Sequence, residues 1–588
     1  MSVHCPTSAR GGLYRALTDR VPPTDADAGA GAGADAESKS KSTPAHQWAT
    51  RFFTLLPGRF DDPIQCRLLE STIGEMQNRY EALSYTWGDA TDKVPISVND
   101  GPVSVTKNLE VALRHLRRES ETRTLWVDAL CINQSDVAEV SAQVQRMWAI
   151  YEHAGRALVF LGPRAECSDE AFALLSELSS LEIGTEHHHR IAATLSSNSN
   201  DDDLLPKAGS LGREYAVARR VVFVCGFREL SNEDFGKALE VLVDYKFNGC
   251  SLRPDHHRLI RRIATASIHH LWFTRQTYQT SGLDQRPDVG AIIHRFRGHK
   301  AFDPRDKIYS LYRLIAENPR LAPDYSRSVV DLYKDVVRVM MENSGTLEVL
   351  SRHNNGVQGG VDGLPTWCPD WTVLRGKRFR LWQKGYQATR GLHDDKTPFF
   401  CIEGDTLRLR GKLLDRVRWR KDFASDDFEE PEKIYRDILD IELVARQMAT
   451  NRREEDGADD DTSFEDAFRK TLVGARAFVK GQNGKDHYRT LSPNATSSLW
   501  LAWSSHVQGK PCDTRLARRY SNALYGAMSG RAFVITEAGS MGLVDGTVQV
   551  GDVIGVFSGG RVPLALRPVE PSPTLAGAPD RYELVGEW

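Results

Sequence analysis

The sequence predicts an α/β domain built on a parallel sheet, followed by a helical region and a β-rich C-terminal module. An apolar run near residues 125–130 leads into an amphipathic helical pattern and then a second apolar run. Helical patterns dominate residues 233–350, and glycine-punctuated, strand-like runs occupy 400–417 and 532–569. The expected parts are a disordered segment at 1–48, the α/β domain at 49–232, the helical region at 233–351 and the β-rich module at 352–588.

The N-terminal segment is expected to be disordered because residues 22–46 contain no apolar side chain larger than alanine. Its GAGAGA stretch does not predict a dinucleotide-binding loop, since such a loop must follow a strand and open a helix.

Ordered structure is expected from Phe52 onward. The stretch Glu81–Trp87 is typical of a strand, and residues 96–105 predict a hairpin with its turn at Asn99–Gly101. Asn108 is then expected to cap a helix.

The clearest unit follows. Residues 125–130 predict a strand buried on both faces. Asp136 and Glu139 have capping-box spacing, so a helix should begin near Val137. One apolar face then recurs at steps of three and four, carried by Val140, Val144, Met147, Tyr151 and Ala154. Gly155 is expected as a left-handed C-cap before a strand at 157–162, which completes a βαβ unit.

Polar side chains at the end of the first strand predict a site, because ligands gather beyond the carboxyl ends of parallel strands. Asp128, Asn133 and Gln134 fall there. The alternative is structural, with these side chains holding the loop together. Tyr85 and Trp87 can either stack on a flat ligand or plug the core. Cys131 is either a nucleophile or an inert buried thiol.

Later segments favour structural roles. Residues 331–345 predict a helix that stops at Gly345. The charged residues Asp303, Arg305, Asp306 and Lys307 are expected to form an interdomain clamp, not a catalytic set. Trp367, Asp370 and Trp371 predict a rigid aromatic turn, and residues 452–461 a solvated acidic loop.

Composition excludes several classes of protein. The 76 basic and 79 acidic residues give a net charge of -3, which argues against nucleic-acid binding. Nine cysteines without CxxC pairs and no secretory leader favour a reduced, cytoplasmic location. No run is long and apolar enough for a membrane span. No metal site or resident cofactor is expected, since adjacent histidines point to different sides of a helix.

Several long motifs resemble one family. ALSYTWG at 82–88, LWVDALCINQ at 125–134 and the helix pattern from Gln143 to Ala154 are similar to the heterokaryon-incompatibility domain of filamentous fungi. Segments at 296–315, 323–333 and 364–371 and the C-terminal tail resemble sequences that accompany that domain.

The resemblance implies non-self recognition between fused fungal cells, leading to growth arrest and cell death. It implies an α/β fold distantly similar to Toll/interleukin-1-receptor domains, protein partners or self-association, and possible binding or cleavage of NAD. The implied ligand or signalling site comprises Ser84, Tyr85, Trp87, Gly88, Asp128, Cys131, Asn133 and Gln134. Structural roles are implied for Gln143, Met147, Tyr151, Asp303, Arg305, Asp306, Trp367, Asp370 and Trp371.

The sequence departs from the family in one place. A Gln-Glu signature that usually precedes the next strand is not recognisable in residues 210–226, although Glu214 lies there. Either the site has decayed or sequence is missing between about 185 and 215. The catalytic candidates are therefore Asp128 and Glu214, and two functions stay open: a signalling module, which the missing signature favours, and an NAD-consuming hydrolase.

Overall fold

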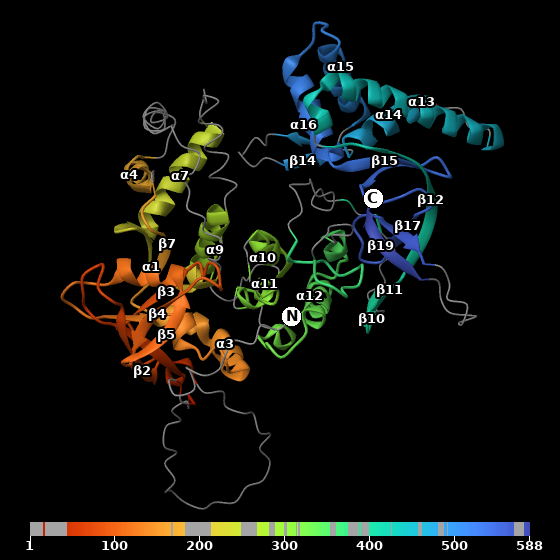
Figure 1. Ribbon diagram of the computed structural model, residues 1–588. Coiled ribbons are helices and arrows are strands. Elements are labelled where there is room, and N and C mark those ends of the chain that lie inside the picture. Colours follow the sequence, from red (N-terminus) through yellow and green to blue (C-terminus); the bar gives the residue numbers. More distant parts are fainter. Residues whose placement is uncertain are drawn as a thin grey trace, which may run out of the picture. The chain divides into compact units, whose positions relative to one another are not determined.

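The chain forms two compact units in a computed structural model, Met1–Leu332 and Tyr333–Trp588 (Figure 1). The structure describes residues 14, 16, 17, 44–165, 168–182, 213–248, 267–281, 289–298, 301, 303–312, 314–315, 318–352, 360–373, 386, 388–389, 399–424, 426–456, 461–474, 476–479, 487–490, 492–569 and 581–588. The expected disordered segment at 1–48 falls largely outside these residues, and the division at 48, 232 and 351 stays a prediction.

The first unit is built on a nine-stranded mixed sheet in the order β5-β4-β2-β1-β6-β3-β7-β8-β9. Its strands are β1 (Ala49–Leu55), β2 (Gln65–Thr72), β3 (Glu81–Tyr85), β4 (Lys93–Val98), β5 (Gly101–Thr106), β6 (Arg123–Trp126), β7 (Arg156–Gly162), β8 (Val221–Cys225) and β9 (Arg228–Ser231).

The centre of this sheet is parallel, as the sequence predicted, but the whole sheet is not. Strand β3 pairs in parallel with β6 and β7, and β7 pairs in parallel with β8. Strands β1 and β9 join the two sides of this centre in antiparallel fashion. Across the sheet these four parallel strands have the order β6-β3-β7-β8. Numbered by their order in the sequence they read 2-1-3-4, which is the flavodoxin-like order.

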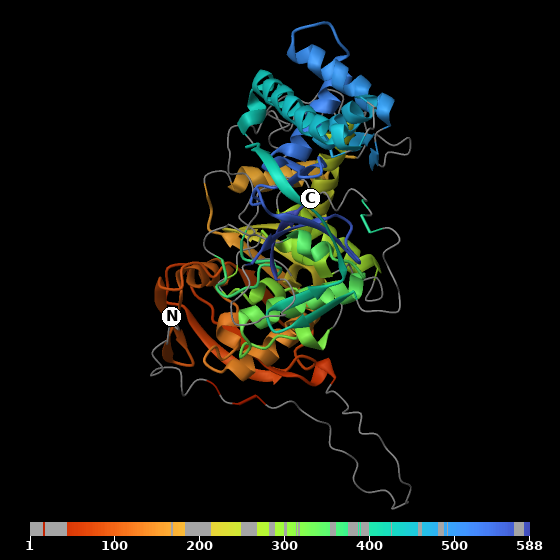
Figure 2. The ribbon, with the colours of Figure 1, turned by 90° about the vertical axis from the view of Figure 1, so that its right-hand side faces the viewer.

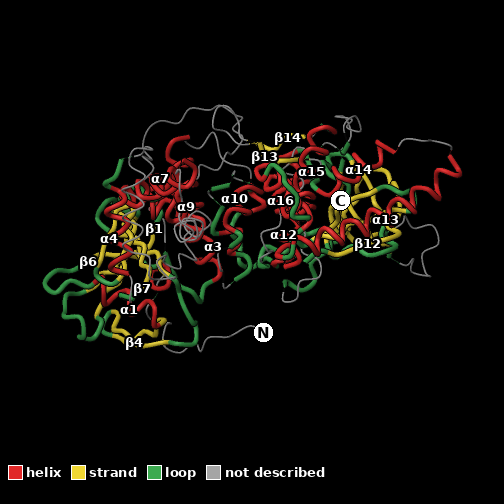
Figure 3. Tube along the Cα trace, turned by 90° about the horizontal axis from the view of Figure 1, so that it is seen from above, coloured by secondary structure: helices red, strands yellow, loops and turns green. Residues whose placement is uncertain are grey.

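Helices cover both faces of the parallel centre (Figure 3). Trp126 on β6 packs against Tyr151 of α3 (Val137–His153). Phe160 on β7 packs against His115 of α1 (Lys107–Leu116). The strand register places Trp126 and Phe160 on opposite faces, because side chains alternate along each strand.

Local structure confirms some predictions and corrects others. The hairpin turn at Asn99 and Asp100 forms with positive φ at both residues. The Asp136 side chain accepts hydrogen bonds from the amides of Ala138 and Glu139 and so caps α3, as predicted. The cap expected from Asn108 is wrong, because α1 begins one residue earlier and the Asn108 amide donates to the Thr86 carbonyl.

Two further predictions around the βαβ unit are wrong. The strand expected through residue 130 ends at Trp126, and Asp128–Cys131 form the single-turn helix α2. Gly155 is not a left-handed cap, since α3 ends at an extended Ala154. Gly155 instead lies close to the backbone of Asn78, where a Cβ would come 3.2 Å from the carbonyl oxygen.

The middle of the chain is helical, as predicted. Its helices are α7 (Asn232–Asn248), α9 (Ser267–Ser281), α10 (Val289–Phe296), α11 (Asp306–Tyr309) and α12 (Val329–Ser344), with short 3-10 turns at Pro319–Leu321 and Glu348–Arg352. Before this region lie α4 (Ser168–Ser179), α6 (Arg213–Val217) and, ahead of β1, a 3-10 turn at Ala45–Gln47. The predicted helix stop at Gly345 is confirmed, with a φ of 62° directly after α12.

The second unit is an antiparallel half-barrel with helices on one side (Figure 2). Its six-stranded sheet has the order β16-β15-β12-β17-β18-β19. The strands are β10 (Phe400–Glu403), β11 (Thr406–Leu409), β12 (Gly411–Asp422), β13 (Arg476–Val479), β14 (His487–Thr490), β15 (Arg531–Thr536), β16 (Met541–Asp545), β17 (Val553–Phe557), β18 (Leu564–Pro568) and β19 (Tyr582–Glu587). The helices are α13 (Pro431–Asp456), α14 (Asp461–Leu472), α15 (Pro493–Val507) and α16 (Thr514–Met528), with a 3-10 turn at Asp426–Glu429.

Successive side chains of β15 point to opposite faces of the sheet and belong to two different hydrophobic cores. Phe533 and Ile535 pack with the helices, whereas Ala532 and Val534 pack with the inner faces of the other strands. The acidic stretch predicted as a loop at 452–461 is helical to Asp456, because α13 continues that far, and 457–460 lie outside the described residues.

A half-buried ion cluster links the parallel strands. Glu81 on β3 accepts hydrogen bonds from Arg123 on β6 and, at 2.6 Å, from Arg156 on β7. Burial opposes ionisation of this carboxyl, but the two guanidinium groups outweigh it and hold the pKa of Glu81 below its ordinary value of 4.5.

We expect this cluster to make the first unit sensitive to acid. A lowered folded-state pKa stabilises the fold above the unfolded pKa, and that contribution disappears as the pH falls through and below 4.5. Glu81→Gln should cost about 3 kcal/mol at pH 7, because it leaves two arginines short of a partner, and should flatten the acid limb of the stability curve. Glu229→Gln is the matched control, since its exposed ion pair with Arg156 should contribute under about 1 kcal/mol. Urea denaturation from pH 3.5 to 7 measures both, and equal losses in the two variants would contradict the assignment.

Candidate functional site

The candidate site lies at the carboxyl ends of β3 and β6, and we call residues 84–88 and 127–136 the crest. At its outer edge the indole Nε1 of Trp87 donates to the Asp128 carboxylate over 2.9 Å. Trp87 is 42% exposed. The structure therefore brings together two of the predicted site residues from different strands.

The turn after β6 is held by its own polar groups. The Asp128 carboxylate accepts a hydrogen bond from the Ala129 amide at 2.7 Å, and the Gln134 side chain donates to the Asp128 carbonyl at 2.9 Å. The Asn133 side chain accepts from the Ser135 amide at 3.2 Å. Asp128, Asn133 and Gln134 thus do meet at one place, where they bond the loop itself.

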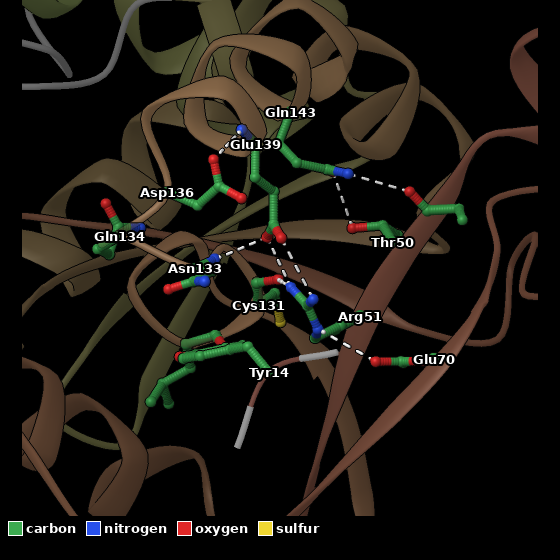
Figure 4. Close-up of polar contacts among 12 residues, drawn as sticks. Tyr14, Thr50, Arg51, Glu70, Cys131, Asn133, Gln134, Asp136, Glu139 and Gln143 are labelled. Carbon is green, nitrogen blue, oxygen red and sulfur yellow. Dashed lines mark hydrogen bonds and ion pairs between the residues drawn. The ribbon is translucent and has the colours of Figure 1, made fainter. Parts of the chain in front are cut away.

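A buried arginine organises the crest from below (Figure 4). Arg51 on β1 is 1% exposed and holds the Glu139 carboxylate through two nitrogens, at 2.6 and 3.2 Å. It also donates to the Cys131 carbonyl at 3.3 Å and lies 3.4 Å from Glu70. Glu139 in turn accepts from the Asn133 amide at 2.7 Å, so one ion pair links β1, α3 and the crest.

Sequence reasoning missed Arg51 and read Glu139 only as a capping-box residue. The sole signal was one charged residue in a strand, Ala49–Leu55, that is otherwise uncharged and mostly buried. Such a residue needs a buried partner. The sequence gives no way to choose that partner across 88 residues.

The family-motif residues of α3, Gln143, Met147 and Tyr151, lie against the sheet, and two of them form hydrogen bonds with β1 and β3. The Gln143 side chain donates to the Ala49 carbonyl and accepts from Thr50, which in turn accepts from the Trp126 indole. Tyr151 donates to the Leu83 carbonyl at 2.9 Å. Met147 is buried on the same helix.

Ser84 and Tyr85 form the buried side of the crest, and Gly88 is exposed. Ser84 and Tyr85 are buried, so Tyr85 is part of the core and presents no face for stacking. Burial, and then the nearby charge of Asp128, raise the pKa of Tyr85 well above its ordinary value. Gly88 has a φ of 75°, and a Cβ there would come 2.6 Å from the Asn108 amide.

Cys131 is a buried residue of the crest and carries a neutral thiol. Its sulfur accepts the Val127 amide at 3.3 Å, and burial raises the pKa of the thiol to about 12, against the opposing effect of Arg51. Since the thiolate is the reactive form, the geometry favours an inert thiol over a nucleophile.

We expect alkylation to distinguish the two readings of Cys131. At pH 8 in the native chain, iodoacetamide should modify the exposed Cys401 and leave Cys131 intact, and Cys131 should react only after denaturation. Peptide mass spectrometry measures both sites in one sample. Modification of native Cys131 at the rate of Cys401 would show an accessible, activated thiol.

The other family-motif residues lie away from the crest. Asp303 and Arg305 pair at 2.6 Å, Arg305 donates to the Arg327 carbonyl, and Asp306 accepts from the Tyr325 hydroxyl. This clamp is local to the first unit, where the Tyr325 amide also donates to Ser141 of α3. It therefore fixes the 323–327 loop and does not touch the candidate site.

The aromatic turn of the second unit is also structural in its contacts. The Trp367 indole donates to the Asp405 carbonyl at 2.8 Å. Asp370 accepts hydrogen bonds from the Val361 amide and from Thr372, and Trp371 packs against Tyr333.

The second catalytic candidate has no described side chain. Glu214 belongs to α6, the helix that precedes β8, and the structure describes its backbone but not its side chain. Over the described parts of the chain, no group of three or more His, Cys, Asp or Glu side chains is placed to hold a metal ion. Within the same parts, no helix combines the length and apolar character needed to cross a membrane.

An open groove of about 530 Å³ lies elsewhere on the first unit. The start of β2, the β4–β5 hairpin and α1 line it, with Asp61, Glu110 and Arg114 among its charged residues. None of the predicted site residues lines this groove.

Comparison with known proteins relates the chain to one family. Residues 80–219 match the family described as heterokaryon incompatibility protein (HET), and residues 439–587 match the Het-6 β-barrel domain. The chain is similar to "Heterokaryon incompatibility protein 6, OR allele" of Neurospora crassa, with 23% identity over 87% of this chain and 89% of that protein. No solved structure matches the chain.

Proposed function

We propose that this chain, a HET-domain protein related to the Neurospora incompatibility protein, is a cytoplasmic signalling protein of fungal non-self recognition. Its α/β unit triggers growth arrest or programmed cell death by associating with itself or with a protein partner. Nucleic acid and membranes are not part of this proposal.

One observation carries it: the polar groups of the crest bond one another, while an aromatic side chain stays exposed. The Gln134 side chain donates to the Asp128 carbonyl, and Glu139 of α3 accepts from the Asn133 amide. Trp87 is exposed and is held in place by its hydrogen bond to the Asp128 carboxylate. A rigid, exposed aromatic residue among satisfied polar groups is typical of a protein-binding anchor.

The experiment is inducible expression in a filamentous fungal host, with viability and self-association measured together. The wild type should arrest growth, and Trp87→Ala should abolish arrest at equal soluble levels. Leu69→Ala is the matched control, because Leu69 is similarly exposed but lies on β2. Arrest by Trp87→Ala equal to that of the wild type would refute the crest as the docking surface.

The second candidate, an NAD-consuming hydrolase similar to Toll/interleukin-1-receptor domains, has support from topology. The flavodoxin-like order of β6, β3, β7 and β8 places Asp128 and Trp87 at strand ends, where such sheets bind nucleotides. Cleavage of a ribosyl bond needs a carboxylate near the oxocarbenium-like centre. Asp128 and Glu214 are the candidates for that carboxylate.

A further inference from the structure

Tyr14 lies against the crest. Tyr14 is half-buried, and its hydroxyl donates to the Leu130 carbonyl over 3.1 Å, across 116 residues of sequence. Its ring lies 4.9 Å from the Arg51 guanidinium carbon. Figure 4 shows the ring on the side of Arg51 away from Glu139.

The chemistry of α2 explains why a phenol fits there. A helix of four residues leaves its last carbonyl groups without partners inside the helix. Arg51 takes the Cys131 carbonyl, and Tyr14 takes the Leu130 carbonyl. The two side chains together satisfy the end of this turn.

The guanidinium of Arg51 adds a second contact for the ring. Arg51 is buried and its edge is used by Glu139 and Cys131, so its face is presented to an aromatic ring. Such a contact strengthens when water is excluded. A tyrosine therefore gains at two points, whereas phenylalanine gains only at the ring.

We propose that Arg51 and the Leu130 carbonyl form a tyrosine-binding slot, filled in cis by Tyr14, which latches the crest. Tyr14 belongs to the same chain as the slot, so it acts as an intramolecular ligand. Tethering raises its effective concentration, and modest affinity suffices to keep the slot filled. This inference goes beyond the proposed function, and its test does not require that the chain kill cells.

Hydrogen exchange of the full-length chain tests the latch. Tyr14→Ala should speed exchange of the amides at 127–134 by roughly tenfold, because one hydrogen bond and one cation–π contact are lost. Tyr14→Phe should fall between the wild type and Tyr14→Ala. Tyr525→Ala, an exposed tyrosine of the second unit, is the matched control and should leave these amides unchanged. Equal exchange in the wild type and Tyr14→Ala would overturn the latch.

A peptide in trans tests the slot itself. A synthetic peptide of residues 10–18, RGGLYRALT, should restore slow exchange at 127–134 in Tyr14→Ala and have little effect on the wild type. The same peptide with phenylalanine in place of tyrosine should restore it less. Failure of the tyrosine peptide to slow exchange at millimolar concentration would overturn the slot.

Discussion

Replacing Arg51 with methionine will lower the free energy of unfolding of the first unit by about 3 to 5 kcal/mol, because it leaves a buried carboxylate without its cation. Glu139 is only 10% exposed at its side chain and holds both Arg51 and the Asn133 amide. The loss therefore reaches the crest, and growth arrest should disappear with it.

Urea denaturation followed by hydrogen exchange in β1 and α3 isolates this unit from the rest of the chain. Glu70→Gln is the matched control, since Glu70 also pairs with Arg51 but is 45% exposed. That substitution should cost under about 1 kcal/mol. A denaturation midpoint for Arg51→Met equal to that of Glu70→Gln would show that the Glu139 pair does not hold the crest.

The second large effect concerns the half-barrel of the second unit. Arg531 on β15 and Glu587 on β19 pair at 3.1 Å across a sheet in which these strands are not neighbours. Both side chains are buried. Burial raises the pKa of Glu587 above its ordinary value, and Arg531 opposes that rise. The pair thus fixes the two sides of the curved sheet to one another.

Arg531→Met should lower the free energy of unfolding of the second unit by about 3 to 5 kcal/mol at neutral pH and by less in acid. A raised folded-state pKa favours the fold below the unfolded pKa of 4.5, and this contribution is lost as the pH rises through the folded pKa. Without its cation Glu587 should bind a proton more tightly, so the deficit grows from pH 5 to pH 8.

Two further variants make this prediction specific. Adding Glu587→Gln to Arg531→Met should recover much of the loss, because a neutral amide replaces the unpaired carboxylate. Arg408→Met removes an exposed pair with Glu403 and should lower the free energy of unfolding by under about 1 kcal/mol. Urea denaturation at pH 5 and pH 8 measures all three, and a deficit in Arg531→Met that does not change with pH would contradict the role of Glu587.

Local signals predicted much of the fold. Asp136 before an apolar face marked the start of α3, and glycine after α12 marked its end, because caps depend on a few adjacent residues. The parallel centre followed from apolar runs separated by a helix. The β4–β5 hairpin was also predicted from its turn, but the antiparallel pairing of β1 and β9 with this centre was not, because pairing partners are set by tertiary contacts and not by periodicity.

The positions of the candidate site residues were predicted, but their hydrogen-bond partners were not. Asp128, Asn133 and Gln134 do meet where parallel strands end, as position in a βαβ unit requires. Their bonding to the loop, to Glu139 and through it to Arg51 depends on residues far away in sequence. Tyr14 was hidden for the same reason, since it belongs to a segment whose composition favours disorder.

In the proposed function the crest is a docking surface and not an NAD-cleaving site. The most direct measurement is cellular NAD and viability together, in a time course after induction of the wild type and Asp128→Asn at matched soluble levels. We expect loss of viability while NAD stays at its starting level. A fall in NAD that precedes death in the wild type and is absent in Asp128→Asn would contradict it and establish the hydrolase.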